Sequence, residues 1–276
     1  MVSDATDDDG SYYVRIGQDR FRPTVHAQGA WSPDQQHMAP VSGLLVREIE
    51  ACHARDDLIL SRVGFDILGV IPAAEVQVRT QVIRPGRTIE LVEAEMVAGG
   101  RVVVRATAWR LAMTDTSAIA GGDVPALPGP DAGDAWSGSG IWGGGFIRSV
   151  QFRVLPGWQP GRGRAWLRTD VDLVAGEPSS PMARYFGLID TANGIAVRAD
   201  PSTVLFPNTD LTVHLVREPV GPWVGLDTTV TYGADGVGLT ASVLHDEQGP
   251  VGRAAQTLTI RPVAPPRTPE RAPVST

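Results

Sequence analysis

Two stretches of this 276-residue chain carry the same order of predicted elements, and this repeat constrains the fold more than any single motif. Each stretch predicts one helix, at residues 39–54 and 180–197, followed by a series of strands. A shift of 144 positions aligns identical residues near the starts of the two helices, in the pairs Met38/Met182, Ala39/Ala183, Gly43/Gly187 and Leu44/Leu188. These matches favour an internal duplication over a chance likeness between two amphipathic helices.

The runs that follow each helix are rich in Val, Ile and Thr and are bounded by turn residues, which is typical of antiparallel strands. The predicted strands lie at residues 58–65, 75–84, 88–98 and 101–111 in the first half, and 210–217, 224–232, 239–245 and 251–260 in the second. Gly99 and Gly100 stand between two of these runs as a hairpin turn. The sequence therefore predicts an α+β fold.

Shifts in composition predict the domain boundaries. The two units are residues 1–112 and 146–262, and a connector at 113–145, dense in Gly, Pro, Ser and Asp, joins them. Residues 138–143 fit G-x-G-x-x-G but lie inside this Gly-rich stretch, so we interpret them as linker and not as a dinucleotide-binding loop. The acidic start, residues 1–11, and the Pro-rich end, residues 263–276, are predicted to be disordered.

Composition excludes several classes of function. All 24 basic residues are Arg, so Schiff-base catalysis, a pyridoxal phosphate anchor and a P-loop are ruled out. The formal net charge of -7 opposes a nucleic-acid partner. Cys52 is the single cysteine, which excludes an intrachain disulfide and favours a reducing, cytoplasmic setting. No apolar stretch approaches the roughly 20 residues that span a bilayer, so no membrane partner is expected.

Common catalytic and metal motifs are missing from the sequence. The five histidines show no local ligand spacing, so we expect no metal site, and the sequence contains no G-x-S-x-G elbow.

Asp190 is the most conspicuous polar candidate. The predicted helix places it on one face with Phe186, Gly187, Asn193 and Gly194, among small and apolar neighbours. A carboxylate in such surroundings is either paired or poised for proton chemistry. The alternatives are a solvent-facing Asp or an ion pair with Arg184 or Arg198.

Two further candidates lie near predicted strands. Alternation along the last strand puts Gln256 on the apolar face with Ala254 and Leu258, where a buried amide needs partners. Asn208 and Thr209 precede the first strand after the second helix. Taken singly, Gln256 is better explained by a structural hydrogen bond to a neighbouring loop than by catalysis, and the 207–210 segment is also explained by an ordinary Asx turn.

The order of elements over residues 12–262 resembles the double-hotdog acyl-CoA thioesterases of the thioesterase II type. That family uses an Asp on the second central helix, a Thr or Ser near the following strand and a Gln on a late strand to orient the hydrolytic water. The resemblance implies this role for Asp190 and Gln256, whereas the middle position departs, with Asn208 aligned and Thr209 one step further on. Val46 stands where the duplication would place a second Asp190, so one catalytic constellation per chain is expected.

The resemblance implies two central helices wrapped by an extended antiparallel sheet, hydrolysis of coenzyme A or acyl-carrier-protein thioesters, and no cofactor. Backbone N–H groups near residues 37–39 are candidates to polarise the thioester carbonyl. The candidate substrate-binding residues, whose aromatic members are equally explained as core, are Trp31, His37, Met38, Tyr185, Phe186 and Asn193.

Alternatives of other classes remain open at this stage. One is a hotdog cyclase, isomerase or dehydratase acting on a polyketide-like chain, and the other is a non-catalytic acyl-chain binding protein. Because edge strands of such sheets often pair between chains, a homo-oligomer is also expected.

Overall fold

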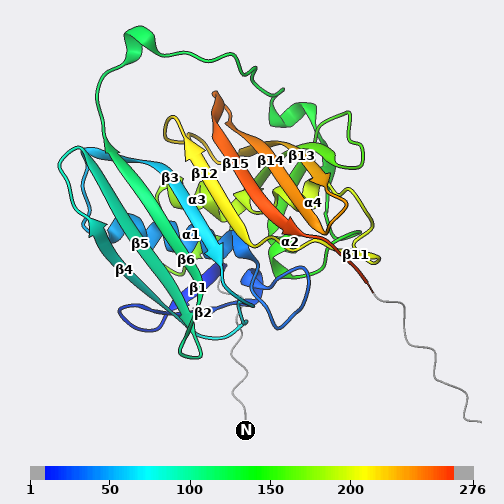
Figure 1. The fold of residues 1–276 in the computed structure, drawn as a ribbon, viewed down its shortest axis with the longest axis horizontal. Helices are drawn as coiled ribbons and strands as arrows, with labels where there is room; N and C mark the ends of the chain where they lie inside the picture. Colours follow the sequence, from blue (N-terminus) through cyan, green and yellow to red (C-terminus); the bar gives the residue numbers. More distant parts are fainter. Residues whose placement is uncertain (1–9, 264–276) are drawn as a thin grey trace, which may run out of the picture.

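The computed structural model describes residues 10–263, and most of them surround one large, mostly antiparallel sheet (Figure 1). The order of its strands across the sheet is β10-β1-β2-β4-β5-β6-β3-β12-β15-β14-β13-β9-β8-β7. The strands of the first half are β1 (Ser11–Arg15), β2 (Arg20–Pro23), β3 (Leu58–Ile67), β4 (Val76–Arg84), β5 (Ile89–Ala98) and β6 (Arg101–Ala112). Those after it are β7 (Asp134–Trp136), β8 (Val150–Val154), β9 (Arg162–Thr169), β10 (Asp172–Val174), β12 (Asp210–Leu215), β13 (Val224–Tyr232), β14 (Val237–Asp246) and β15 (Gly249–Thr259).

The strand order reads the same outward from its centre. At the centre β3 pairs with β12, with Val63 opposite Val213. Outward from β3 come β6, β5, β4, β2 and β1, and outward from β12 come β15, β14, β13, β9 and β8, so the two halves follow in matching order. The repeated order of elements expected from the sequence is therefore present, and the α+β class is confirmed. A separate two-stranded ladder joins β11 (Val204–Leu205) to β16 (Arg261–Pro262).

The helices of the described chain include two longer ones that contact each other behind the long strands in Figure 1. These are α1 (Met38–Ala51) and α3 (Pro181–Ile189). The shorter ones are η1 (Val25–Ala27), η2 (Ser117–Ile119), η3 (Pro130–Ala132), α2 (Gly145–Ser149) and α4 (Ala192–Ile195). None of the helices in residues 10–263 is long and apolar enough to cross a membrane.

The α1–α3 contact explains why the repeat is visible in the sequence. A Cβ on Gly43 would lie 2.9 Å from the Ala183 carbonyl oxygen and 3.0 Å from Gly187 Cα, so only glycine allows this approach. The hydroxyl of Ser42 donates to the carbonyl of Phe186 at 2.7 Å, which ties the two helices together at the same level. Three of the residues that match between the halves, Gly43, Ala183 and Gly187, thus lie where the helices cross.

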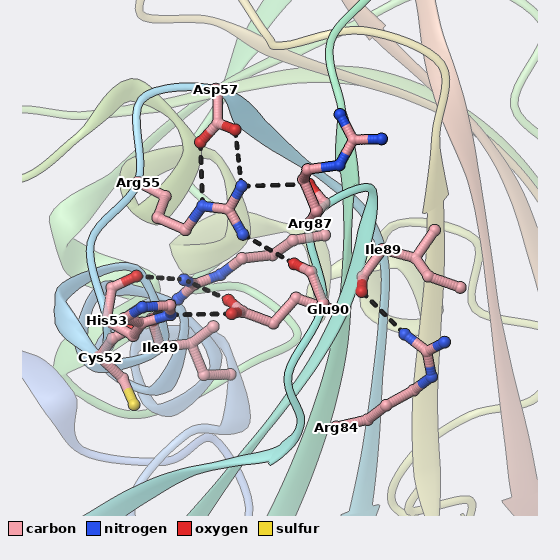
Figure 2. A network of polar contacts seen from close by, with 11 residues as sticks. Ile49, Cys52, His53, Arg55, Asp57, Arg84, Arg87, Ile89 and Glu90 are labelled. Atoms are coloured by element: carbon pink, nitrogen blue, oxygen red, sulfur yellow. Dashed lines mark hydrogen bonds and ion pairs between the residues drawn. The ribbon is translucent and has the colours of Figure 1, made fainter.

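An arginine fixes the other end of α1. Arg110 on β6 donates to the backbone carbonyls of Ile49, Cys52 and His53, in and just after the last turn of the helix, where carbonyls lack their usual i+4 partners. Its charge is met by Glu90, a fully buried carboxylate that also contacts His53 at 2.8 Å (Figure 2). This network holds α1 to β5 and β6, and so fixes the position of the helix whose first turn faces the site described below.

Three expectations from the sequence are corrected. The helix expected over residues 180–197 is broken, because α3 ends at Ile189 and α4 starts at Ala192. The connector was expected to hold no element, yet it contains β7, which pairs with β8.

The third correction concerns the chain ends. Ser11 is fully buried at the start of β1, and the Val263 N–H donates to the Thr203 carbonyl, so these two residues are ordered. The rest of the expected disorder falls on residues 1–9 and 264–276, outside the described residues, and on Gly10, an exposed residue beside β1.

Candidate active site

The break between α3 and α4 creates the position of Asp190. Asp190 is the C-cap of α3, which corrects the sequence prediction that it lies in the interior of a helix. Thr191 closes the turn, with its Oγ1 and its N–H both donating to the carbonyl of Leu188. Side-chain hydroxyls that bond nearby carbonyls compete with regular helical bonds, and Asn193 and Gly194 have low helix propensity. The carboxylate therefore projects from a helix end.

Asp190 is 5 % exposed and accepts two hydrogen bonds from amides. Asn208 Nδ2 and Gln256 Nε2 each donate to Asp190 Oδ1 at 2.8 Å. Burial raises the pKa of Asp190 to about 7, although these two donors oppose the rise. The alternative of an exposed carboxylate is wrong, because Asp190 is buried. The alternative of an ion pair with Arg184 or Arg198 is also wrong, because these arginines donate to the carbonyls of Ser179 and Val230.

His37 faces the second oxygen of the same carboxylate. Its Nδ1 lies 3.9 Å from Asp190 Oδ2 and accepts a hydrogen bond from the Ala39 N–H, as the N-cap of α1. Burial lowers the pKa of His37 to about 3, so the ring is neutral and the contact is not an ion pair. The ring stacks on Phe146 with centroids 4.1 Å apart, which holds it in place.

A cavity of about 450 Å³, here called the Asp190 cavity, brings these groups together. Its lining residues are Gly29, Ala30, Trp31, Gln35, Gln36, His37, Met38, Ile67, Gly69, Val70, Ile71, Asp190, Asn193, Pro207, Asn208, Thr209, Thr259 and Arg261. The first turn of α1 and the C-cap of α3 therefore open into one space, with elements from both halves of the chain around it.

The predicted site residues divide into those at this cavity and those elsewhere. Asp190, Asn208, Thr209, His37, Met38, Asn193 and Trp31 line it, and Gln256 reaches Asp190 from β15, buried with Ala254 and Leu258 as the alternation predicts. Thr209 is exposed and its Oγ1 donates to the Thr257 carbonyl at 3.5 Å, so its side chain makes no hydrogen bond to Asp190.

Two predicted substrate-binding residues lie away from the Asp190 cavity. Tyr185 donates its hydroxyl to the His245 carbonyl and lines a different hollow, beside β9 and β10. Phe186 is fully buried and packs on Phe65, with ring centroids 6.0 Å apart. Both are therefore core residues, which is the alternative that the sequence analysis left open for the aromatic candidates.

The sequence interpretation missed two aromatic residues, Trp142 and Phe206, that pack against Trp31 next to the cavity. Trp142 comes from the connector segment interpreted as linker, is 7 % exposed, and meets Trp31 and Phe206 edge to face with centroids 5.1 and 5.8 Å apart. A tryptophan inside a Gly-rich run is a signal that this run docks on a core, because an exposed linker gains nothing from an indole.

In the described part of the chain, no group of three His, Cys, Asp or Glu side chains is arranged to hold a metal ion. The polar groups around Asp190 are two amides, its own carboxylate and a histidine whose Nδ1 already accepts a hydrogen bond. What this set can do is hold a polar molecule next to a carboxylate that changes protonation near neutral pH.

Comparison with solved structures gives the same fold. The chain is similar to a candidate thioesterase II from Thermobifida fusca YX, at 18% identity over 95% of this chain and 99% of that one, with a TM-score of 0.69. It is also similar to a hot dog fold protein of Alicyclobacillus acidocaldarius, at 15% identity over 95% and 100% of the two chains, with a TM-score of 0.71. A third is the acyl-CoA thioesterase II TesB2 of Mycobacterium marinum, at 14% identity over 96% and 100%, with a TM-score of 0.66.

Sequence comparison identifies the family. A search of curated protein sequences returned no match. The profile of the acyl-CoA thioesterase N-terminal domain matches residues 27–111, and that of the C-terminal domain matches residues 122–260. These matches cover most of the chain, and the hydrolase class predicted from the sequence is confirmed. The chain belongs to the acyl-CoA thioesterase family.

Proposed function

We propose that this chain hydrolyses acyl thioesters with Asp190 as the general base that activates the attacking water. The observation that carries the proposal is the setting of Asp190, a buried carboxylate with a pKa of about 7 in a cavity shared with the first turn of α1. Near neutral pH such a group exists in both protonation states. It is therefore able to take a proton from water and to return it later in the reaction.

The amide donors support a defined place for the water. Both hydrogen bonds go to Asp190 Oδ1, which leaves Oδ2 to accept a proton from the water. The Gln256 Oε1 is buried and has no hydrogen-bond donor among the described residues, so it is available to accept the second water hydrogen. Asn208 thus takes the family's middle position, and Thr209 has a lesser role or none.

The reaction follows from these roles. Oδ2 takes a proton while the water oxygen bonds to the thioester carbon, and the carbonyl electron pair moves to oxygen. At the start of α1 the N–H groups of His37 and Ala39 already donate, to the Ala27 carbonyl and to His37 Nδ1, and Pro40 has no N–H. The Met38 N–H, which has no intrahelical partner, is therefore the donor for this oxyanion. When the intermediate collapses, the C–S bond breaks and the leaving sulfur takes the proton from Asp190. The products are a carboxylic acid and a free thiol, and the base is regenerated.

The substrate class follows from the family, whose name refers to acyl-CoA, and carrier-bound acyl chains share the same pantetheine thioester. The proposal treats residues 1–112 and 146–262 as two hotdog units joined by residues 113–145, each supplying one central helix, α1 and α3. The homo-oligomer and the cytoplasmic location stay predictions from the sequence.

The test is release of thiol from a panel of acyl-CoA thioesters, with Cys52 as a constant background of one thiol per chain. Asp190→Asn should lower kcat by about 10² to 10⁴. Gln256→Ala should lower it less, and the double variant should add little to the Asp190→Asn loss, because both groups act on one step. Asp210→Asn is the matched control, since the Asp210 carboxylate accepts from the Thr257 N–H beside the site and does not contact Asp190.

Full turnover by folded Asp190→Asn would reject Asp190 as the base. The same assay separates hydrolysis from the other classes, because an isomerase, a dehydratase or a binding protein leaves the thioester intact.

A further inference from the structure

Three hollows lie in a row along the connector side of the site. The Asp190 cavity shares Ala30, Trp31, His37 and Asn193 with a second hollow of only about 30 Å³, here called the aromatic pocket. The aromatic pocket in turn shares Trp136, Gly194 and Ile195 with a third hollow of about 470 Å³, here called the outer pocket. The small aromatic pocket therefore separates two spaces that are each more than ten times larger.

Trp142 lines the aromatic pocket next to Gly194. Its Nε1 donates to the carbonyl of Gly194, a residue that both the aromatic and the outer pocket share, at 3.0 Å. A Cβ on Gly194 would lie 3.3 Å from that Nε1, so the glycine lets the indole lie against the α4 backbone. Edge-to-face contacts with Trp31 and Phe206 hold the other sides of the ring. These contacts hold the indole in one position, where it forms part of the wall of the aromatic pocket.

The chemistry of the linings tells which part of a thioester each hollow suits. The Asp190 cavity mixes apolar side chains with Gln35 and Arg261, which match the amides and the anionic end of a pantetheine carrier. The aromatic pocket is lined by Trp136, Ile147, Phe152 and Ile195, which suit an alkyl group. His37 lines both hollows and Asp190 lines the larger one beside it, so a carbonyl placed at His37 next to Asp190 directs the acyl group into the aromatic pocket.

We propose that Trp142 sets the length of the acyl group and limits this chain to thioesters of short acids. This inference rests on the proposed hydrolysis and adds its substrate class. On the measure by which one water needs roughly 10–15 Å³, a cavity of about 30 Å³ has room for two or three groups of that size, so it accepts acyl groups of about two to four carbons. Longer chains meet the indole of Trp142 and must displace it from Gly194 to gain more room.

The experiment measures kcat/KM for acetyl-, butyryl-, hexanoyl- and octanoyl-CoA. In the unaltered protein, each pair of methylenes beyond butyryl should lower kcat/KM by at least about tenfold. Trp142→Ala removes an indole from the wall of the aromatic pocket and enlarges it, so the octanoyl-to-butyryl ratio should rise by about tenfold to a hundredfold. Trp142→Phe, which keeps a ring and loses the bond to Gly194, should fall between the two and covers the case in which the alanine variant does not fold.

Trp158→Ala is the matched control. Trp158 also donates its Nε1 to a carbonyl of α4, that of Ile195 at 3.1 Å, but it lines the outer pocket and not the aromatic pocket. Losing that bond should therefore leave the length profile unchanged. The proposal is overturned if folded Trp142 variants keep the original profile, if the unaltered protein prefers octanoyl-CoA, or if Trp158→Ala shifts the profile as far as Trp142→Ala.

A second readout separates this inference from the proposed function. The dissociation constants of the same acyl-CoAs are measured by calorimetry on Asp190→Asn, with and without Trp142→Ala. If no thioester is hydrolysed, the proposed function fails, while a length cutoff in binding that Trp142→Ala removes still supports the role of Trp142. Binding that is independent of chain length in both variants overturns it.

Discussion

Asp190 combines two properties that usually exclude each other, because a buried carboxylate is costly and a base must ionise. The two amide donors on Oδ1 reduce this cost without removing it, and the pKa stays raised at about 7. The neighbouring His37 adds no compensating positive charge, since its pKa of about 3 keeps it neutral. We therefore expect the ionised Asp190 to lower the free energy of unfolding of the protein.

The first prediction concerns stability against pH. A carboxyl whose pKa is higher in the folded chain than in the unfolded one contributes stability below its ordinary pKa, and this contribution is lost as the pH rises through the folded value. For a rise from 3.8 to about 7, the difference is about 4 kcal/mol. Asp190→Asn should therefore flatten the fall in unfolding free energy between pH 4 and 7, and should be more stable than the parent at pH 8. Urea unfolding at pH 5 and pH 8 measures this; an unchanged pH dependence would refute it.

The second prediction distinguishes Asn208 from Thr209. Hydrolysis by the ionised carboxylate should rise with pH around a pKa near 7. Asn208→Ala removes a donor that lowers the pKa of Asp190, so the midpoint of the kcat/KM profile should move to higher pH. The Thr209 hydroxyl is directed at the Thr257 carbonyl, so Thr209→Ala should leave the midpoint in place. The reverse pattern would return the middle role to Thr209.

The sequence predicted the members of this cluster but not their geometry. Strand alternation is enough to bury Gln256, and a family pattern is enough to pair it with Asp190. Which of Asn208 and Thr209 meets the carboxylate depends on the direction of the backbone just before β12, which no residue pattern encodes. Trp142 was missed because composition describes a segment as a whole and hides one anchored residue within it.

At the scale of elements, strands were predicted more closely than helices. Each long strand alternates between a buried and an exposed face, so its ends are visible within a few residues. The helical interpretation ran through residue 197 because the spacing of apolar residues continues across α4, whereas the break depends on local hydrogen bonds from Thr191. That break shapes the candidate site, because the Asp190 carboxylate projects from the end of α3 and lines the cavity.

The third prediction tests the helix crossing. Gly43→Ala puts a Cβ against the backbone of α3 and should lower the unfolding free energy by about 1 to 3 kcal/mol. Gly187→Ala is a matched control in the partner helix, because its Cβ meets nothing within 4 Å and alanine favours a helix by up to about 1 kcal/mol. Thermal unfolding of the two variants should move in opposite directions. Equal shifts would mean that the crossing is not the tight contact described.

The whole molecule is held together by contacts that do not pass through the connector. β3 pairs with β12 from Asp66 to Arg62, and α1 packs on α3, so each half completes the sheet and the core of the other. The connector is exposed between Thr114 and Asp123 and becomes anchored at Pro128, whose carbonyl accepts from Trp166 Nε1. In Figure 1 this green segment arches along the top of the view, away from the labelled strands of the sheet.

The fourth prediction follows from this layout. A site-specific protease sequence inserted between Gly121 and Gly122 should allow complete cleavage without separating the halves. The two fragments should co-elute in size-exclusion chromatography and separate only under denaturing conditions, with thioesterase activity retained. An insertion of the same length that lacks the cleavage sequence controls for the insertion itself. Dissociation after cleavage would show that the connector, and not the β3–β12 pairing, joins the halves.

The contact between α1 and α3 also orients the electrostatics of the cavity. α1 begins at the cavity and α3 ends there, so the partial positive charge of one helix end and the partial negative charge of the other face the same space. A carbonyl with its oxygen toward α1 lies along the resulting electric field, and the negative end of α3 strengthens Asp190 as a proton acceptor. Because packing at Gly43 fixes both helices, this field exists before any substrate arrives and needs no rearrangement during the reaction.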